Sequence, residues 1–388
     1  MTVKTFRIWH LIHKWTSLVC TVFLLLLCLT GLPLIFRDEL SLWLGDAVEP
    51  PEHVTNLAPV SLETLVADAR ARRPQDHVKF LIRDEERPAW FVSLGTTPTA
   101  PDNSALFMYD ARTGAFLHDR PTNEGVLNLL LKLHVELFAG LPGTLFLGAM
   151  GILFLASIIS GIVLYGPFMR KLAFGTIRLE GSLRLTWLDL HNLLGIVTLL
   201  WALVVGATGV VSSLDRPLLA YWQMTEIAGM LAPWKDTPVS ITVRPVDDVL
   251  HAAEAADRDL AVRFIAFPGT PFAGPHHYMV FMRGQTALTG RLLKPLLINA
   301  HTAQVNETGN LPWYLTALLL SQPLHFGDYG GMPLKIIWAL LDLLTIAVLV
   351  SGLCLWRKRQ PLPGDLLVGE QEVDARDRHW RVNRISCR

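Results

Sequence analysis

Four long apolar runs divide the chain, and each is long enough to cross a lipid bilayer. They cover residues 15–36, 137–169, 190–214 and about 334–356. The first three contain no Asp, Glu, Lys or Arg, whereas the fourth contains Lys335 near its start and Asp342 inside it. A membrane-spanning helix needs about 20 predominantly apolar residues. The pattern therefore predicts four transmembrane helices.

Two segments of mixed polarity, about 37–133 and 213–323, have short stretches of alternating and helical hydrophobic pattern, which are typical of small α/β domains. The first predicts a helix that begins after Ser61 as N-cap, three strands and a hairpin turn, at residues 61–72, 78–83, 89–94, 105–109 and 110–114. The second predicts the same elements in the same order, at residues 246–257, 261–267, 278–283, 293–298 and 299–303. Each segment is therefore predicted to fold as one α/β domain.

Landmark residues recur along the chain at fixed offsets. Two sets are separated by 191 residues, namely His134, Gly140, Pro142, Ser160-Gly161 and Tyr165, and then His325, Gly331, Pro333, Ser351-Gly352 and Trp356. Two further sets are separated by 178 residues, namely His13 and Thr30-Gly31, and then His191 and Thr208-Gly209. Such regularity predicts two tandem halves, each with two spanning helices and one α/β domain.

The composition agrees with a membrane protein and excludes several classes of function. Hydrophobic residues make up 51% of the chain and charged residues 18%, and the net charge is near zero, so no nucleic-acid partner is indicated. The four cysteines form no C-x-x-C-H motif, which excludes covalent c-type haem by this criterion. Glycine-rich nucleotide motifs are also lacking, so electrons for a redox reaction would come from a membrane quinol or a separate reductase.

Basic residues are concentrated in the short loops, and this bias predicts the orientation. They precede the first span (Lys4, Arg7, Lys14), separate the second from the third (Arg170, Lys171, Arg178, Arg184) and follow the fourth (Arg357, Lys358, Arg359). Positively charged loops stay in the cytoplasm. Both termini are thus predicted to be cytoplasmic and both α/β domains periplasmic, in a bacterial inner membrane. The first span is too long for a removable signal peptide and lacks a small-residue cleavage pattern, so we expect a retained helix.

These observations predict a domain order of eight parts. They are the N-terminus with the first spanning helix (1–36), the first outer domain (37–133), the second spanning helix (134–169), a cytoplasmic loop (170–186), the third spanning helix (187–214), the second outer domain (215–323), the fourth spanning helix (324–356) and a cytoplasmic tail (357–388).

Several stretches resemble the PepSY-associated transmembrane family. They are LHVELFAGLPG, DLHNLLG, the HKW of the first span and PLHFGDYGGMPLK with SGLCLW, while the D-x-x-T-G turn resembles the PepSY domains of that family. The resemblance extends over residues about 5–357 and implies an inner-membrane ferric-siderophore reductase with two non-covalent haems b. The ferric siderophore would be the substrate, reduced on the periplasmic side to release Fe(II).

The histidines are consistent with this implication when they are considered by themselves. A b-type haem in a helical bundle takes two axial imidazoles from two helices, and four of the 13 histidines recur at helix ends: His13, His134, His191 and His325. His10, three residues before His13, could replace it as a ligand. A single histidine at a membrane boundary is more often a neutral interfacial side chain, and a non-haem iron or copper site would favour histidines clustered with carboxylates.

Distance along the helices predicts how these histidines pair. Gly31 follows His13 by 18 residues, or roughly 27 Å of helix, which is close to the thickness of a bilayer core. His13 and His191 open helices that enter from the cytoplasm, whereas His134 and His325 precede helices that enter from outside. We therefore expect His13 to pair with His191 at an inner haem, and His134 with His325 at an outer one.

Other polar residues have weaker claims. His276, His277 and His301 could contact substrate or metal, but exposed loop histidines are the expected interpretation. Asp342 should face the bundle interior, with a role near a haem edge, in a proton path, or as a structural hydrogen-bonding group. A function from another class is also open: a non-redox siderophore permease subunit, or a regulator that binds periplasmic proteins through its PepSY domains.

Overall fold

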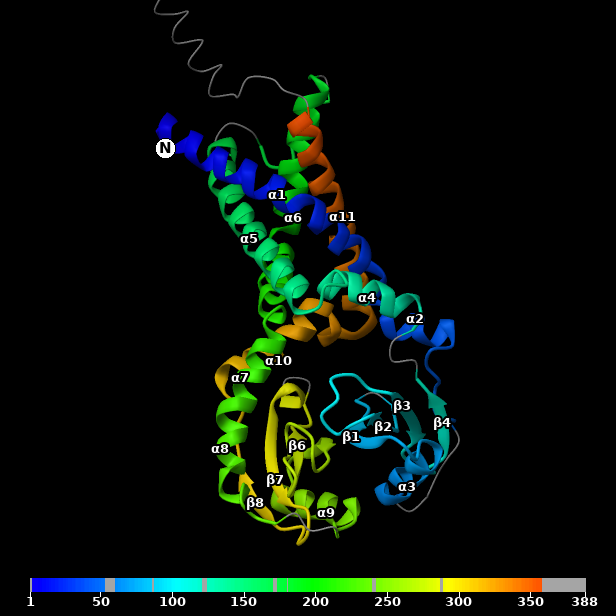
Figure 1. Ribbon diagram of the computed structural model, residues 1–388. Helices are drawn as coiled ribbons and strands as arrows, with labels where there is room; N and C mark the ends of the chain where they lie inside the picture. The colour runs from blue at the N-terminus through cyan, green and yellow to red at the C-terminus, as the bar shows by residue number, and fades with distance from the viewer. Residues whose placement is uncertain are drawn as a thin grey trace, which may run out of the picture. The chain divides into compact units, whose positions relative to one another are not determined.

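The computed structural model describes residues 2–52, 60–85, 87–120, 124–169, 173–179, 181–238, 242–286 and 289–357 (Figure 1). The predicted cytoplasmic tail beyond Arg357 lies outside the described residues, as do Arg170 and Lys171 of the predicted loop. The chain forms two compact units. We call them the helical unit (Met1–Leu29, Ala149–Ala207 and Ile337–Arg388) and the sheet unit (Thr30–Gly148 and Thr208–Ile336).

Within the described residues, four helices are long and apolar enough to cross a membrane, as predicted. They are α1 (Val3–Ile35), α5 (Leu141–Met169), α6 (Leu183–Ser212) and α11 (Gly331–Arg357). The second and fourth begin later than the predicted 134 and 324, because His134 and His325 lie on separate shorter helices. A helix satisfies its backbone hydrogen bonds internally, which is what allows a continuous apolar run to enter lipid.

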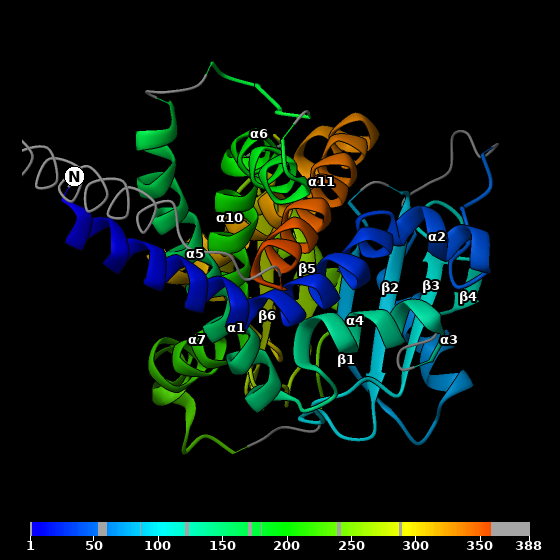
Figure 2. The same cartoon turned by 90° about the horizontal axis from the view of Figure 1, so that it is seen from above.

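Contacts between pairs of spanning helices hold the helical unit together. The Ser17 and Ser157 hydroxyls of α1 and α5 are 2.6 Å apart, and α6 lies beside α11 (Figures 1 and 2). A buried apolar cluster from α1, α5 and α11 consists of Cys20, Leu24, Met150 and Leu349. Small hydroxyl-bearing and apolar side chains therefore form the interhelical contacts, as is usual in membrane bundles.

One eight-stranded antiparallel sheet forms the centre of the sheet unit. Its strand order is β4-β3-β2-β1-β5-β6-β7-β8. The strands are β1 (His77–Arg83), β2 (Ala89–Gly95), β3 (Ala105–Asp110), β4 (Phe116–Asp119), β5 (Ala261–Ala266), β6 (His277–Arg283), β7 (Leu293–Asn299) and β8 (Val305–Thr308). Each of the two polar segments contributes four strands.

The prediction of two separate α/β domains is wrong, because β1 and β5 pair with each other. Phe80, Leu81 and Ile82 of β1 are in register with Ala266, Ile265 and Phe264 of β5. Without this pairing, each segment would expose an edge strand with unpaired backbone N–H and C=O groups. Joining the edges satisfies those groups and makes a single sheet.

Helices α3 (Leu62–Arg72) and α9 (Val246–Ala256), both predicted, pack on one face of the sheet (Figure 1). Their N-termini are capped reciprocally. The Asp247 carboxylate accepts hydrogen bonds from the Leu62 backbone N–H, at 2.7 Å, and from the Ser61 hydroxyl, while Glu63 accepts one from the Val246 N–H at 3.0 Å. Ser61 is at the predicted N-cap position, but the cap is supplied by the other segment.

The opposite face of the sheet is covered by helices that the sequence pattern did not predict. They are α7 (Asp215–Trp222), the π-helix η1 (Gln223–Ile227), α8 (Ala228–Leu231) and α10 (Trp313–Phe326). Along β6, Tyr278 and Val280 face α3 and α9, whereas Met279 and Phe281 face this second layer. Both faces of β6 are therefore buried, which explains why this strand lacks a polar face.

Short elements complete the described chain. They are α2 (Arg37–Leu44), α4 (Val126–Glu136), η2 (Ala232–Trp234), η3 (Thr289–Arg291) and η4 (Asp328–Gly330). The Glu39 carboxylate of α2 lies 3.0 Å from the Lys335 ammonium of α11, which accounts for the basic residue near the start of the fourth apolar run.

The two predicted hairpin turns have equivalent polar caps. Asp110 accepts hydrogen bonds from the Arg112 backbone N–H and guanidinium, and these bonds lower the pKa of the Asp110 carboxyl. Asn299 accepts bonds from the backbone N–H groups of His301 and Thr302. A side-chain oxygen two residues before the turn N–H is the common requirement, and both Asp and Asn supply it.

Two histidine pairs as a candidate site

His13 and His191 face each other inside the helical unit. His13 lies on α1 and His191 on α6, with ring centroids 6.3 Å apart and ring planes inclined by 73°. His10 also lies on α1, but the ring opposite His191 is that of His13. The structure therefore brings together the two histidines that were expected at the inner position.

A second helix holds each of these rings from behind. Nδ1 of His13 is 2.9 Å from the Ser157 carbonyl oxygen and 3.2 Å from the Ser160 hydroxyl on α5. Nδ1 of His191 is 3.1 Å from the Val348 carbonyl oxygen and 2.9 Å from the Ser351 hydroxyl on α11. An Nδ1–H that donates to a carbonyl determines the tautomer, so that Nε2 is the nitrogen without a proton.

His134 and His325 form an equivalent pair within the sheet unit. His134 lies on α4 and His325 on α10, again with centroids 6.3 Å apart and with planes inclined by 61°. Nδ1 of His134 is 3.0 Å from the Thr30 hydroxyl, and Nδ1 of His325 is 3.3 Å from the Thr208 hydroxyl. This pair is also the one that was expected.

All four imidazoles pack against a hydroxyl-glycine dipeptide of another helix. The dipeptides are Thr30-Gly31, Ser160-Gly161, Thr208-Gly209 and Ser351-Gly352. A Cβ on Gly31, Gly161 or Gly209 would lie only 3.0, 3.2 or 3.1 Å from Cε1 of its histidine. The hydroxyl orients the ring, and the absent side chain makes room for it. The offsets of 178 and 191 identified these dipeptides as landmarks, but their contact with the histidines appears only in the fold.

The turn after His134 has an uncommon backbone conformation. Leu137 and Phe138 have φ of 51° and 57°, and Gly140 has φ of 61°. Left-handed conformations cost roughly 1–2 kcal/mol for residues with a Cβ. Three of them close together reverse the chain between α4 and α5, which places His134 outside the spanning helix instead of at its start.

The spacing of each pair suits two imidazoles on one metal ion. A metal–imidazole bond of about 2.0 Å, with ring bonds of roughly 1.33 Å, places the centroids of two opposed axial rings about 6.3 Å apart. A direct N–H···N hydrogen bond would bring them to about 5 Å. The observed 6.3 Å in both pairs agrees with the first arrangement.

The donor set distinguishes between kinds of metal site. Among the residues that the structure describes, no group of three or more His, Cys, Asp or Glu side chains is placed to hold an ion. A non-haem iron or copper site needs such a group. A b-type haem takes two imidazoles from two helices of a bundle, and each pair supplies two imidazoles from two helices, so the residues present fit such a haem.

Asp342 is buried in the helical unit, which confirms the expected orientation toward the bundle interior. Only 6% of the Asp342 surface is exposed, and the Asp342 carboxylate accepts a hydrogen bond from the Cys28 thiol of α1. The Oδ2 atom is buried and, among the described residues, has no hydrogen-bond partner.

The histidines of the sheet unit differ from their expected exposure. His276 is 4% exposed and His277 is fully buried, so the prediction of solvent-exposed loop residues is wrong for both. His277 begins β6, where it pairs with Asn299 of the neighbouring strand and meets the Trp234 ring edge-on at 5.0 Å. Burial, followed by the proximity of His276 and His301, lowers the pKa of His277 to about 4.

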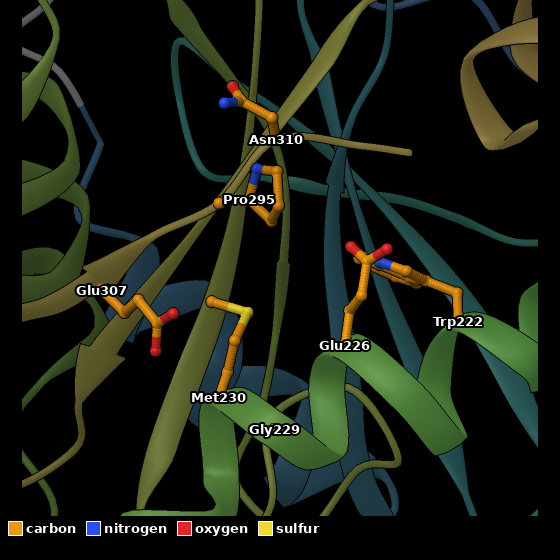
Figure 3. Close-up of a pocket in the computed structure, with 8 residues that line it drawn as sticks. Trp222, Glu226, Gly229, Met230, Pro295, Glu307 and Asn310 are labelled. Atoms are coloured by element: carbon orange, nitrogen blue, oxygen red, sulfur yellow. The ribbon is translucent and has the colours of Figure 1, made fainter. Parts of the chain in front are cut away.

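A cavity of about 310 Å³ lies on the α7–α8 side of the sheet unit (Figure 3). The described residues of its lining are Trp222, Glu226, Gly229, Met230, Pro295, Glu307, Gly309 and Asn310. The Trp222 indole N–H donates to the Glu226 carboxylate at 3.2 Å, and the two side chains lie together in the close-up. None of the four paired histidines belongs to this lining.

The four spanning helices define a multi-pass α-helical membrane protein, and its antiparallel sheet is a separate unit. The sequence pattern of the PepSY-associated TM region matches residues 10–359, so the chain belongs to that family. The chain is also similar to the uncharacterized protein PA4219 of Pseudomonas aeruginosa. The two are 27% identical over 266 residues, which cover 62% of this chain and 66% of that protein.

Proposed function

We propose that the protein holds two haems b and transfers electrons through them to a ferric siderophore. One haem would bind between His13 and His191, and the other between His134 and His325. The observation that carries this proposal is the recurrence of one geometry, with centroids 6.3 Å apart in both pairs.

The residues of each pair have distinct roles in this proposal. Nε2 of each histidine would coordinate the haem iron, while the Nδ1 bond to Ser160, Ser351, Thr30 or Thr208 orients the ring and raises its basicity. The bound haems supply reversible one-electron exchange. The apolar side chains of the spans exclude water and bring the macrocycle into the bundle, which needs no covalent attachment.

The direction of transfer follows from the charge of the loops. Basic loops on the cytoplasmic side would place both termini in the cytoplasm, and the sheet unit on the periplasmic side of an inner membrane. His134 and His325, which belong to the sheet unit, would then hold the haem nearer to the substrate. The tandem organisation is supported by the four strands from each segment and by the four equivalent histidine–dipeptide contacts.

The chemistry asks little more of the protein than electron delivery. Fe(III) is held tightly by the hard oxygen ligands of a siderophore, whereas Fe(II) is held weakly. One electron, from a quinol or a separate reductase, therefore releases the metal, and neither a nucleophile nor a general base is needed.

The test is an absorption spectrum of the purified protein before and after reduction, with the haem content per chain. We expect a Soret band and an α band, and two haems per chain. The reduced protein should then be reoxidised by a ferric siderophore, with Fe(II) captured by a ferrous chelator. The His134→Ala/His325→Ala double variant should lose this reoxidation. A native protein without haem bands would overturn the reductase proposal in favour of a permease subunit or a PepSY-type binding protein.

A further inference from the structure

Asp342 is an acidic side chain in the middle of a spanning helix. It lies 14 residues after Asp328 and 15 before Arg357, the limits of the fourth candidate span. The corresponding position of α5, at the offset of 191, is Gly151. Helix packing in the other half therefore does without a carboxyl group at this position, and an ionisable group at such a depth indicates a function.

Among the described residues Asp342 forms no ion pair, and Lys335, seven residues before it on α11, is paired with Glu39 instead. The Cys28 thiol donates to the carboxylate, and Oδ2 is buried without a partner among the described residues. Helix α5 has no Asp, Glu, Lys or Arg, and the ionisable residues of α6 lie in its first nine positions, namely Arg184, Asp189 and His191. Those of α1, apart from Cys20 and Cys28, are Lys4, Arg7, His10, His13 and Lys14 near its start.

Asp342 is also on the helix that supports the inner histidine pair. Ser351 of α11 bonds Nδ1 of His191 and follows Asp342 by nine residues, or roughly 13.5 Å along the helix. In apolar surroundings, charges interact more strongly over a given distance than they do in water. A change of charge at the inner pair is therefore felt at Asp342.

We propose that Asp342 is a redox-linked proton site, and this inference rests on the proposed haem function. When one electron from the quinol or reductase converts Fe(III) to Fe(II) at the inner pair, the Asp342 carboxylate takes up one proton from water and becomes the neutral acid. When the electron leaves for the ferric siderophore, Asp342 releases that proton. The net charge of the helical unit is then the same in both states, which keeps the desolvation cost of electron entry low.

The experiment is a redox titration of the haem absorbance at several pH values, together with a redox-induced infrared difference spectrum. We expect the potential of one haem to fall with rising pH, by up to about 59 mV per tenfold decrease in proton concentration. Reduction should also produce the C=O stretch of a protonated carboxyl group. Asp342→Asn should abolish both signals and retain two haems. Asp342→Glu keeps a carboxyl group and should retain the pH dependence, so it provides the test if the asparagine variant fails to fold.

Two further variants sharpen the assignment. Cys28→Ala removes the thiol donor, so it should displace the carboxyl band and preserve the pH dependence. Thr345→Ala, which removes a buried hydroxyl one turn away on α11, should leave both signals unchanged. A haem-loaded native protein with pH-independent potentials, or Asp342→Asn with native signals, would overturn this inference alone. Native protein without haem would overturn the inference and the proposed function together.

Discussion

His13 and His191, on α1 and α6, present their imidazole rings to each other at a centroid distance of 6.3 Å. Each ring is held at Nδ1 by a serine of a third or fourth spanning helix, Ser160 of α5 or Ser351 of α11. All four spans therefore converge on this one pair. A bundle that is organised around two imidazoles makes specific predictions about which substitutions act alike.

Histidine substitutions should group by pair. We expect His13→Ala and His191→Ala to lose the same haem component, and His134→Ala and His325→Ala to lose the other, because each haem needs both imidazoles. The measurement is haem stoichiometry with low-temperature spectra of each variant. His10→Ala is the matched control on α1 and should retain both haems. Loss of one common haem in His13→Ala and His134→Ala would contradict the pairing.

A side chain on the three glycines that lie closest to a histidine, Gly31, Gly161 and Gly209, should weaken haem binding. In Gly209→Ala, the new methyl group would lie 3.1 Å from Cε1 of His325, and overpacking of this kind costs about 1–3 kcal/mol. We therefore expect roughly tenfold to hundredfold weaker retention of the outer haem, measured by titration of haem into the apoprotein.

Gly195→Ala is the control, because Gly195 lies on the same helix as Gly209. Apart from its chain neighbours and the backbone of its own helix, no described atom would lie within 4 Å of the new methyl group. Equal haem affinity in the Gly209 and Gly195 variants would show that the ring position does not depend on this close approach.

The reciprocal helix caps should stabilise the sheet unit. Asp247→Ala removes the acceptor for the Leu62 N–H and the Ser61 hydroxyl, and loss of an N-cap costs about 0.5–2 kcal/mol. Asp248→Ala removes only a half-exposed ion pair with Arg244, worth about 0.3–0.5 kcal/mol. Thermal unfolding, monitored by susceptibility to proteolysis, should show the larger decrease in unfolding temperature for Asp247→Ala. A larger decrease for Asp248→Ala would refute the capping interpretation.

Acid should destabilise the sheet unit through His277. Its pKa is about 4 in the folded protein and 6.5 ordinarily, so the unfolded chain binds the proton more readily. Stability from the neutral ring is complete above pH 6.5 and is lost as the pH falls toward 4. The groups nearest to it are His276, His301 and the Trp234 ring.

His277→Phe should reduce this dependence, measured as the difference in unfolding temperature between about pH 7 and about pH 4.5, on either side of the ordinary histidine pKa. Replacement of the exposed His251 by alanine is the control and should leave the native difference in place. An unchanged pH dependence in His277→Phe would assign the acid sensitivity to other groups.

The topology can be tested with a reporter enzyme that is active only outside the cytoplasm. Fusions near Ala100 or Gly290 should be active, because both positions belong to the sheet unit that the loop charges place outside. A fusion after Arg359 should be inactive. Activity at that C-terminal position would reject the proposed orientation.

Local patterns in the sequence determined the elements and the pairing hypothesis. Uninterrupted apolar runs predicted α1, α5, α6 and α11, because a bilayer demands a minimum apolar length. Alternating and β-branched stretches predicted six of the eight strands, while the short β4 and β8 carried too few residues for a periodic signal. Fixed offsets of 191 and 178 identified the four histidines, since equivalent positions in two halves occupy equivalent environments.

Only the tertiary structure decided how these parts meet. Pairing of β1 with β5 merges the two segments into one sheet. This pairing is made by backbone groups, so the pattern of side chains does not predict it. The left-handed turn at Leu137 and Phe138 separates His134 from its span, whereas the predicted bounds of the second spanning helix began at residue 134. The fit of each imidazole against a hydroxyl-glycine dipeptide joins residues more than 100 positions apart, as between Thr30 and His134. Such contacts depend on helix packing, which a one-dimensional pattern does not contain.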